Sequence, residues 1–261
     1  MEKFQLNILG CGSATCTTQH LQTSQVLDIR DNLLMIDCGE GTQLQMRRMH
    51  LKFARLNNIF ISHLHGDHCF GLMGLISTFG LLGRTATLHI YAHCELEKLL
   101  APQLEFFCKG MTYDVEFHAI NPNKAEVIYD DRSVSISTIP LRHRIPTCGF
   151  LFLEKKRNQE PIKRYAYCSD TRYNLGMIEQ IQGVQTLFHE STFSEKLALR
   201  AAKAGHSTAK QAADIALRSG TQKLIIGHFS ARIPDHQEFL VEAQEIFPDT
   251  VLAVERTTID I

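Results

Sequence analysis

The residues best suited to chemistry form one short segment, residues 63–68, which reads HLHGDH. Three imidazoles and one carboxylate within six residues cannot share one face of a helix or alternate cleanly along a strand. In a turn opened by Gly66 they can converge on one or two cations, and this donor set suits zinc, manganese or iron. A polar surface turn would explain a lone histidine, but four potential ligands before an apolar helix favour a metal site.

Strands and helices that must position these groups alternate along the chain. Strands are expected at 4–9, 26–29, 33–36, 59–62, 88–92, 115–120, 134–139, 150–154, 164–168, 186–189, 223–226 and 251–254, and helices at 40–49, 71–82, 208–219 and 236–246. Thr208 as N-cap, Gln211 three residues later and Gly220 after the last turn mark both ends of the third helix. The pattern favours a layered α/β domain with helices outside two sheets. Since composition does not shift along the chain, a single domain over residues 1–261 is expected.

Six residues cannot complete two coordination shells, so further ligands are expected at other strand ends. Three candidates occupy that position: His143 follows the strand at 134–139, Asp170 follows the strand at 164–168, and His228 follows the strand at 223–226. Each alone would be an ordinary loop residue or helix cap. Their recurrence at the same structural position indicates that they belong to the site.

These residues carry a resemblance to a known family. The HxHxDH segment, followed by a histidine, an aspartate and a histidine after successive strands, resembles the metallo-β-lactamase superfamily. The accompanying segments resemble ribonuclease Z, the tRNA 3′-processing endoribonuclease. They are GCGSA at 10–14, DCGEGTQ at 37–43, SDT at 169–171, HESTF at 189–193, GHSTA at 205–209 and HFSAR at 228–232. HxHxDH is common to many hydrolases, whereas HESTF and GHSTA are considerably narrower.

The resemblance implies a four-layer αβ/βα sandwich, the metallo-β-lactamase fold, with two zinc ions at the edge between its sheets. One metal would be held by His63, His65 and His143, the other by Asp67, His68 and His228, with Asp170 as a bridge. Two cations about 3.5–4 Å apart can clamp the attacking and leaving oxygens of a phosphodiester displacement. Asp67 is also suited to accept a proton from the attacking water, and Asp37 is expected to orient a ligand histidine.

A phosphodiesterase also needs a proton donor for the departing alkoxide. The resemblance assigns that role to His206, held by Glu190, because a neighbouring carboxylate raises the pKa of an imidazole and fixes its orientation. Without the family motif, a surface ion pair at a helix start would be the simpler interpretation. The N-terminus of the helix expected at 208–219 is a further candidate phosphate-binding site. The candidate phosphate contacts are Ser207, Thr208, Ser230 and Arg232.

Charge gives less information about the substrate. The chain has 27 Lys and Arg against 28 Asp and Glu, so no overall field favours nucleic acid or membrane. Two basic clusters flank site motifs and suggest a path for a polyanion. The first comprises Arg142, Arg144, Lys155, Lys156, Arg157, Lys163 and Arg164, and the second Arg47, Arg48, Lys52 and Arg55. The expected substrate is precursor tRNA.

The chain departs from the family pattern at one place. Ribonuclease Z typically carries a Gly/Pro-rich arm that grips the tRNA elbow, between the positions of His143 and Asp170. His143 and Asp170 are only 27 positions apart here, and two strands and a turn at 156–161 fill the interval. The grip must therefore come from that basic turn or from a partner subunit. A small-molecule phosphodiesterase acting on cyclic or nucleotide substrates remains the alternative. A non-catalytic metal-binding protein would not need Glu190 and His206.

The remaining features concern location and assembly. The longest nearly apolar run, Cys69–Leu82, has 14 residues against the roughly 20 that a membrane span needs, and the first residues lack the pattern of a signal peptide. Eight cysteines without a C-x-x-C pair are expected to be reduced and mostly buried. We therefore expect a cytoplasmic protein with no membrane partner. The family resemblance suggests a homodimer.

Overall fold

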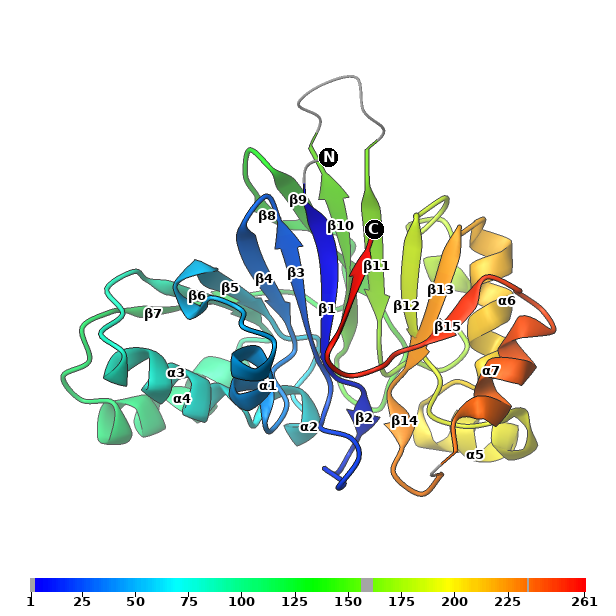
Figure 1. Cartoon of the computed structure of the whole chain (residues 1–261), viewed down its shortest axis with the longest axis horizontal. Coiled ribbons are helices and arrows are strands. Elements are labelled where there is room, and N and C mark those ends of the chain that lie inside the picture. The colour runs from blue at the N-terminus through cyan, green and yellow to red at the C-terminus, as the bar shows by residue number, and fades with distance from the viewer. Residues whose placement is uncertain (1–2, 156–161, 234) are drawn as a thin grey trace. The chain divides into compact units, whose positions relative to one another are not determined.

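The computed structural model describes residues 3–155, 162–233 and 235–261 (Figure 1). Contacts group the chain into two compact units, Met1–Asn121 with Val254–Asp260, and Pro122–Ala253 with Ile261. Each unit is built around its own seven-stranded sheet. The expectation of one domain over residues 1–261 stays a prediction.

The first unit contains a mixed sheet in the order β16-β1-β3-β4-β5-β6-β7. Its strands are β1 (Phe4–Gly10), β3 (Ser24–Ile29), β4 (Asn32–Ile36), β5 (Leu56–Phe60), β6 (Leu88–Ala92), β7 (Val115–Ala119) and β16 (Thr257–Asp260), with the short β2 (Gly12–Ser13) after β1. The pairs from β16 to β4 are antiparallel, and those from β4 to β7 are parallel. The parallel half places the ends of β4, β5 and β6 at one edge.

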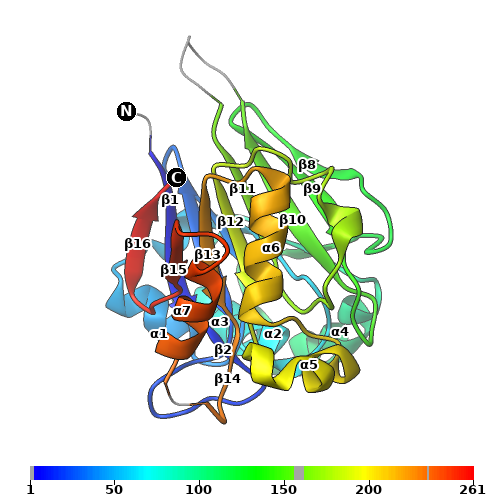
Figure 2. The same cartoon turned by 90° about the vertical axis from the view of Figure 1, so that its right-hand side faces the viewer.

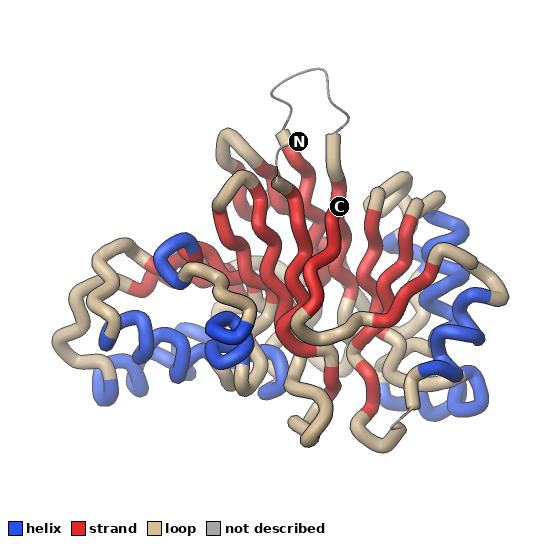
Figure 3. Tube along the Cα trace, in the orientation of Figure 1, coloured by secondary structure: helices blue, strands red, loops and turns tan. Residues whose placement is uncertain are grey.

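Helices pack beside this parallel half (Figures 1 and 3). They are α1 (Thr42–Arg48), α2 (Gly66–Cys69), α3 (Leu72–Leu81) and α4 (Glu95–Phe107), with a 3₁₀ turn η1 (Phe53–Arg55). Leu88 and Ile90 alternate along β6 toward a core that includes Leu75 and Phe79 of α3, all four buried. Each such side chain contributes about 1.5–3 kcal/mol of burial free energy, so this core holds the strand ends in place.

Strands β3 and β4 form a hairpin with a tight turn. Ile29 pairs with Asn32, so only Arg30 and Asp31 form the loop. Both adopt left-handed conformations, with φ of 50° and 68°. Two successive positive φ values define a type I′ turn, whose twist matches that of the flanking strands.

Helix α1 ends in a Schellman motif with a residue other than glycine at its left-handed position. His50 has φ 54° and is exposed, while its N–H donates to Arg47 O and that of Leu51 to Met46 O, at 3.0 and 2.9 Å. His50→Gly should raise the free energy of unfolding by about 1 kcal/mol, because glycine adopts this conformation without a Cβ clash. Urea unfolding measures the gain. His50→Ala keeps the Cβ, and an equal gain in that variant would contradict this explanation.

The second unit contains a mixed sheet in the order β15-β13-β12-β11-β10-β9-β8. Its strands are β8 (Val127–Asp130), β9 (Val134–Pro140), β10 (Cys148–Glu154), β11 (Arg164–Cys168), β12 (Thr186–Glu190), β13 (Lys223–Gly227) and β15 (Thr250–Leu252), with the short β14 (Phe229–Ser230) after β13. Pairs from β8 to β11 are antiparallel, and those from β11 to β15 are parallel. The carboxyl ends of β11, β12 and β13 therefore meet at one edge.

Helices α6 and α7 cover the parallel strands of this sheet (Figure 2). The helical elements are α5 (Ala198–Ala204), α6 (Ala209–Ser219) and α7 (Gln237–Gln244), with 3₁₀ turns η2 (Leu175–Met177) and η3 (Glu195–Leu197). The predicted capping of α6 is confirmed: Thr208 and Gln211 form a reciprocal capping box, and Gly220 ends the helix in the left-handed conformation. Both ends of α6 are thus fixed by local sequence.

Two further expectations concern membranes and thiols. Within the described ranges, no helix is long and apolar enough to cross a bilayer. The eight cysteines, all within the described ranges, are thiols rather than disulfide partners, which agrees with the expected reduced state. Most are at least partly shielded, but Cys16 and Cys94 are exposed because they lie in a loop and at the N-cap of α4.

Candidate metal centre

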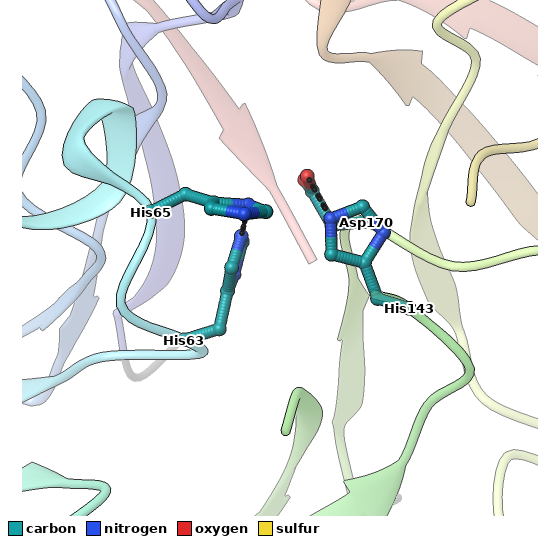
Figure 4. Close-up of side chains that lie close together, drawn as sticks. All are labelled: His63, His65, His143 and Asp170. Carbon is teal, nitrogen blue, oxygen red and sulfur yellow. Dashed lines mark hydrogen bonds and ion pairs between the residues drawn. The ribbon is translucent and has the colours of Figure 1, made fainter. Parts of the chain in front are cut away.

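The histidine-rich segment of the first unit leaves the carboxyl end of β5 and enters α2. His63 is buried, and its Nε2 lies 3.0 Å from Nδ1 of His65 (Figure 4). Nδ1 of His63 lies 3.0 Å from the hydroxyl of Ser62. Two ring nitrogens at this separation can face one cation together. The expected convergence of His63 and His65 is thus present within this unit.

His68 is held by the buried carboxylate of Asp37. Nδ1 of His68 donates to Asp37 Oδ2 at 2.7 Å, while Asp37 accepts from the N–H and the hydroxyl of Ser62 at 2.8 and 2.9 Å. Because Nδ1 carries the proton, Nε2 keeps a lone pair for a metal. The contact that the sequence predicts for Asp37 is therefore present. Asp37 also has φ 55°, a left-handed conformation that costs roughly 1–2 kcal/mol.

Asp67 is oriented by a backbone donor that the sequence patterns do not indicate. The N–H of Ala14 donates to Asp67 Oδ2 at 2.7 Å, and Ala14 has φ 61°. Oδ2 also lies 3.6 Å from Nε2 of His68. This places a carboxylate next to the lone pair of His68. A candidate base and a candidate ligand are thus adjacent in this unit.

In the second unit, His143 is fixed by a carbonyl. Its Nδ1 donates to Gly205 O at 2.7 Å, which leaves Nε2 as the lone-pair nitrogen, 3.6 Å from Asp170 Oδ2 (Figure 4). Gly205 is the left-handed C-cap of α5, with φ 85°. A Cβ at Gly205 would lie 2.8 Å from Nδ1 of His143. Glycine is therefore required both by the turn and by the close approach of the imidazole.

Asp170 and His228 follow β11 and β13, as expected. Asp170 Oδ1 lies 3.0 Å from His228 Nε2 and accepts a hydrogen bond from Ser169 at 2.9 Å. Both residues have left-handed backbones, with φ of 55° and 60°. Strained backbone at buried polar side chains points to a functional constraint. His143, Asp170 and His228 thus form one cluster within the second unit.

Glu190 and His206 also meet in the second unit. Glu190, fully buried at the end of β12, accepts from Nδ1 of His206 at 2.8 Å and from the N–H of Thr171 at 2.9 Å. Burial raises the pKa of Glu190, but the interaction with His206 outweighs it and the net pKa is lowered. Burial likewise opposes the charged form of His206, yet Glu190 raises the pKa of His206 to about 9. His206 is therefore protonated at neutral pH and close to Asp170, at 4.0 Å.

Thr192 connects this pair to the ligand histidine. Its hydroxyl donates to Glu190 Oε2 at 2.7 Å, and the same oxygen lies 3.0 Å from Nδ1 of His228. Since the hydroxyl has one proton, it accepts from His228, whose Nε2 then faces Asp170 as the lone-pair nitrogen. Sequence reasoning did not single out Thr192, although it lies within the HESTF motif.

The four candidate phosphate contacts differ in their environment. Ser207 donates to Thr171 O at 2.7 Å, and the Thr208 hydroxyl donates to Glu195 Oε2 at 2.7 Å while it caps α6. Both hydroxyl protons are therefore used within the unit. Ser230 and the exposed Arg232 lie on β14 and in the loop after it. Arg232 is the better placed of the four to meet an anion from solvent.

The two basic clusters contain both exposed side chains and side chains that contact an acidic or aromatic residue. Arg142 and Arg144 are exposed on either side of His143, whereas Lys155 pairs with Asp130 at 2.6 Å. Lys156 and Arg157, and the turn at 156–161, lie outside the described residues. In the second cluster, Arg55 pairs with Asp31 at 2.8 Å and Arg47 lies over the ring of Phe53.

The donor sets of both units suit a divalent metal. His68 in the first unit and His143 and His228 in the second each have an oxygen atom at hydrogen-bond distance from Nδ1, and each unit also supplies a carboxylate. Such outer hydrogen bonds fix the tautomer and raise the basicity of metal-binding histidines. Among the described residues of the second unit, Asp170, His206 and His228 offer ligand atoms within 4.8 Å of one another.

Comparison with known proteins extends these observations. The crystal structure of human tRNase Z, short form, covers 98% of this chain and 99% of its own with a TM-score of 0.85 and 26% identity. The metallo-β-lactamase fold protein YhfI from Bacillus subtilis covers 99% of both chains with a TM-score of 0.81 and 20% identity. The protein therefore has the metallo-β-lactamase fold, which confirms the expected α/β class.

Sequence relatives define the family. Ribonuclease Z of Phocaeicola vulgatus is 55% identical, covering 100% of this chain and 98% of the relative, and that of Bacteroides thetaiotaomicron is 52% identical, covering 100% and 96%. The family model described as Anti-Pycsar protein Apyc1 matches residues 4–239. The chain therefore belongs to the ribonuclease Z family and to the family that this model describes. Both alignments run over 304 residues, more than the 261 of this chain, so these relatives carry residues without a counterpart here.

Proposed function

We propose that this chain hydrolyses the phosphodiester that joins the 3′ trailer to a precursor tRNA. The products are a tRNA with a 3′-hydroxyl and a trailer with a 5′-phosphate. The observation that carries the proposal is the buried Glu190–His206 pair beside Asp170, in a chain 55% identical to a ribonuclease Z. A metal site alone needs no such pair, whereas cleavage of an unactivated phosphodiester needs a proton donor for the leaving oxygen.

The proposed centre holds two divalent metal ions, with zinc as the expected ion and manganese or iron as ions that the same donors accept. His63, His65 and His143 would hold one ion, Asp67, His68 and His228 would hold the other, and Asp170 would contribute to both. When bound, the ions supply Lewis-acid stabilisation of the charge that develops on the phosphoryl oxygens. We propose that residues 1–261 act as one functional domain.

Two side chains of this centre move protons. Asp67 accepts a proton from the attacking water, and the Ala14 N–H on Oδ2 fixes the rotation of its carboxylate. His206 donates a proton to the departing 3′-oxygen from Nε2, because Nδ1 is engaged by Glu190. Glu190 acts through His206, so it is a positioning residue. General acid and base steps of this kind each contribute about 10²–10⁴-fold to a rate.

Precursor tRNA is held by its phosphates. Arg142 and Arg144 flank His143 and are exposed, and Arg232 follows His228 by four residues. Arginine binds phosphate bidentately, so these three side chains would align the backbone on either side of the scissile bond. We infer that the additional residues of the longer relatives correspond to the short interval between His143 and Asp170. A second copy of the chain, in a homodimer, then supplies the missing grip on tRNA in the cytoplasm.

Cleavage assays on two substrate classes test the proposal. Metal-loaded protein should cut precursor tRNA at the trailer junction at least about tenfold faster than cyclic or nucleotide phosphodiesters at equal concentration. Mature tRNA, which lacks the trailer, is the matched control and should stay intact. Fast hydrolysis of the small substrates with inert precursor tRNA would instead establish the small-molecule phosphodiesterase. Gel analysis with terminal labelling identifies the 3′-hydroxyl product.

A further inference from the structure

A second group of metal-binding side chains lies in the first unit, outside the candidate centre. Cys11 Sγ lies 3.6 Å from Nδ1 of His20 and 4.0 Å from Oε1 of Glu255, and the latter two atoms are 3.6 Å apart. The three residues come from the turn after β1, the loop before β3 and the segment before β16. Among the described residues, this group offers a thiol, an imidazole and a carboxylate within 4.8 Å of one another.

The backbone around the group is fixed by close packing. A Cβ at Gly10 would lie 1.8 Å from Gln22 O, so only glycine lets the segment that carries Cys11 approach the loop that carries His20. The N–H of Gly12 donates to Leu21 O at 2.9 Å. His20 closes a turn in which its N–H donates to the Thr17 hydroxyl at 2.8 Å. Cys11 and His20 are thus brought together by the backbone rather than by each other.

Glu255 is oriented by two donors. Its Oε1 accepts from the N–H of Leu21 at 2.7 Å, and its Oε2 accepts from the side chain of Gln45 at 3.0 Å. The same amide of Gln45 also donates to Leu9 O at 3.0 Å. Hydrogen bonds of this kind hold a ligating carboxylate in position in metal sites. They leave a further lone pair on Oε1, the oxygen that faces Cys11 and His20.

We propose that Cys11, His20 and Glu255 form a second cation site, selective for borderline-soft divalent ions of the zinc class. A circle through the three atoms has a radius of about 2.2 Å, within the range of about 2.0–2.3 Å for zinc bonded to sulfur, nitrogen and oxygen. A thiolate in the donor set favours zinc over magnesium or calcium. Cys11 is buried, whereas the side chain of His20 is 30% exposed, so a fourth ligand enters from solvent on the His20 side.

Binding at this site releases a proton. Burial and the nearby Glu255 raise the pKa of the Cys11 thiol, and burial raises the pKa of Glu255. Without a cation the thiol is therefore protonated at neutral pH. The sulfur–metal bond forms as the S–H bond breaks, and the proton goes to solvent, with no change in oxidation state.

The site joins the C-terminal segment to a loop that reaches the candidate centre. The side chain of Gln22, two residues after His20, donates to Ala14 O at 3.0 Å and accepts from Glu40 N at 2.8 Å. Ala14 in turn donates to Asp67. A cation on Cys11, His20 and Glu255 thus stabilises the loop that orients the proposed base. The proposed role of the cation is structural: it holds this loop in place, since the proposed cleavage needs no substrate group at this site.

Cobalt substitution distinguishes this site from the candidate centre, whose proposed ligands include no sulfur. The full chain loaded with Co²⁺ should show a thiolate-to-cobalt charge-transfer band in the near ultraviolet. Cys11→Ser should lose this band and bind one metal equivalent fewer per chain. His20→Ala, which removes a partly exposed ligand and leaves Cys11 in the core, should weaken cobalt binding at this site at least tenfold.

Cys16→Ser is the matched control, since Cys16 lies in the same loop with its sulfur 4.0 Å from Glu40, and it should keep both the band and the metal count. An unchanged band and metal count in folded Cys11→Ser and His20→Ala proteins would overturn the proposal. Absence of the band in the wild-type chain at saturating Co²⁺ would also overturn it. The result is independent of RNA cleavage: a chain that shows the band but leaves precursor tRNA intact would retain this site and lose the proposed function.

Discussion

Replacing His206 by alanine should lower the rate of precursor tRNA cleavage by about 10²- to 10⁴-fold, the usual contribution of a general acid. The metal content should not change, because His206 is engaged by Glu190 at 2.8 Å and lies 4.0 Å from Asp170. Single-turnover cleavage and metal analysis of the same protein sample measure both quantities. A loss of bound metal in this variant would make His206 a ligand instead.

Substrates with different leaving groups provide the control for this assignment. A nitrophenyl phosphodiester expels an anion that needs little protonation, so His206→Ala should slow its hydrolysis much less than that of RNA. Equal losses on both substrates would remove the proton-donor role. They would leave His206 as a residue that only supports the site.

The pH profile tests whether Glu190 acts through His206. Because the pKa of His206 is raised to about 9, the imidazolium persists at neutral pH and the wild-type rate should fall only as the pH rises through about 9. In Glu190→Gln the pKa of His206 should return toward its ordinary value of about 6.5, so the fall should begin at lower pH. A profile of unchanged shape in that variant would show that Glu190 does not set the protonation of His206.

Removal of divalent metal should abolish cleavage of every phosphodiester and should also lower the thermal stability of the chain. The proposed ligands of each unit would then lack the cation that offsets their charge. A metal that binds the folded state alone stabilises it by about 4 kcal/mol at 1,000 times the Kd. Dialysis against a chelator, followed by titration with zinc, manganese or iron, identifies the ion that restores activity.

Two variants give this experiment its control. Asp170→Asn keeps the shape of the proposed bridge but loses its negative charge and one of its two oxygen donors, so it should need far more metal for the same activity. His50→Asn lies at an exposed position after α1, and asparagine tolerates its left-handed backbone, so its metal requirement should equal that of the wild type. Full cleavage by chelated, metal-free protein would refute the two-metal proposal.

Apart from β8 and β16, the strands of both sheets could be predicted from sequence because their apolar residues alternate or run together at the core. Helix α4 could not, since Pro102 lies inside it and a proline normally ends a helix. Its exposed Leu99, Phe106 and Phe107 also blur the apolar face. Strand β16 was not predicted because it forms by pairing with β1, at the opposite end of the chain.

The candidate ligands could be predicted because each follows a strand and belongs to a metal-binding residue type. Their supporting contacts could not, because they come from backbone groups of distant loops. The Ala14 N–H that reaches Asp67 and the Gly205 carbonyl that reaches His143 leave no mark in residue type alone. The His228–Thr192 contact had a partial signal, since Thr192 lies in a narrow motif.

The single hydroxyl proton of Thr192 has a consequence for the chemistry of its neighbours. The proton points to Glu190 because a carboxylate cannot donate. The hydroxyl oxygen must therefore accept from His228, so His228 carries its own proton on Nδ1. If an amide replaced the carboxylate of Glu190, it could donate to the Thr192 oxygen. The Thr192 hydroxyl could then donate to Nδ1 of His228, and His228 would carry its proton on Nε2. Loss of one negative charge would then disable the proton donor His206 directly, because His206 loses its carboxylate partner, and would remove a metal-binding lone pair of His228 through the rotation of one O–H bond.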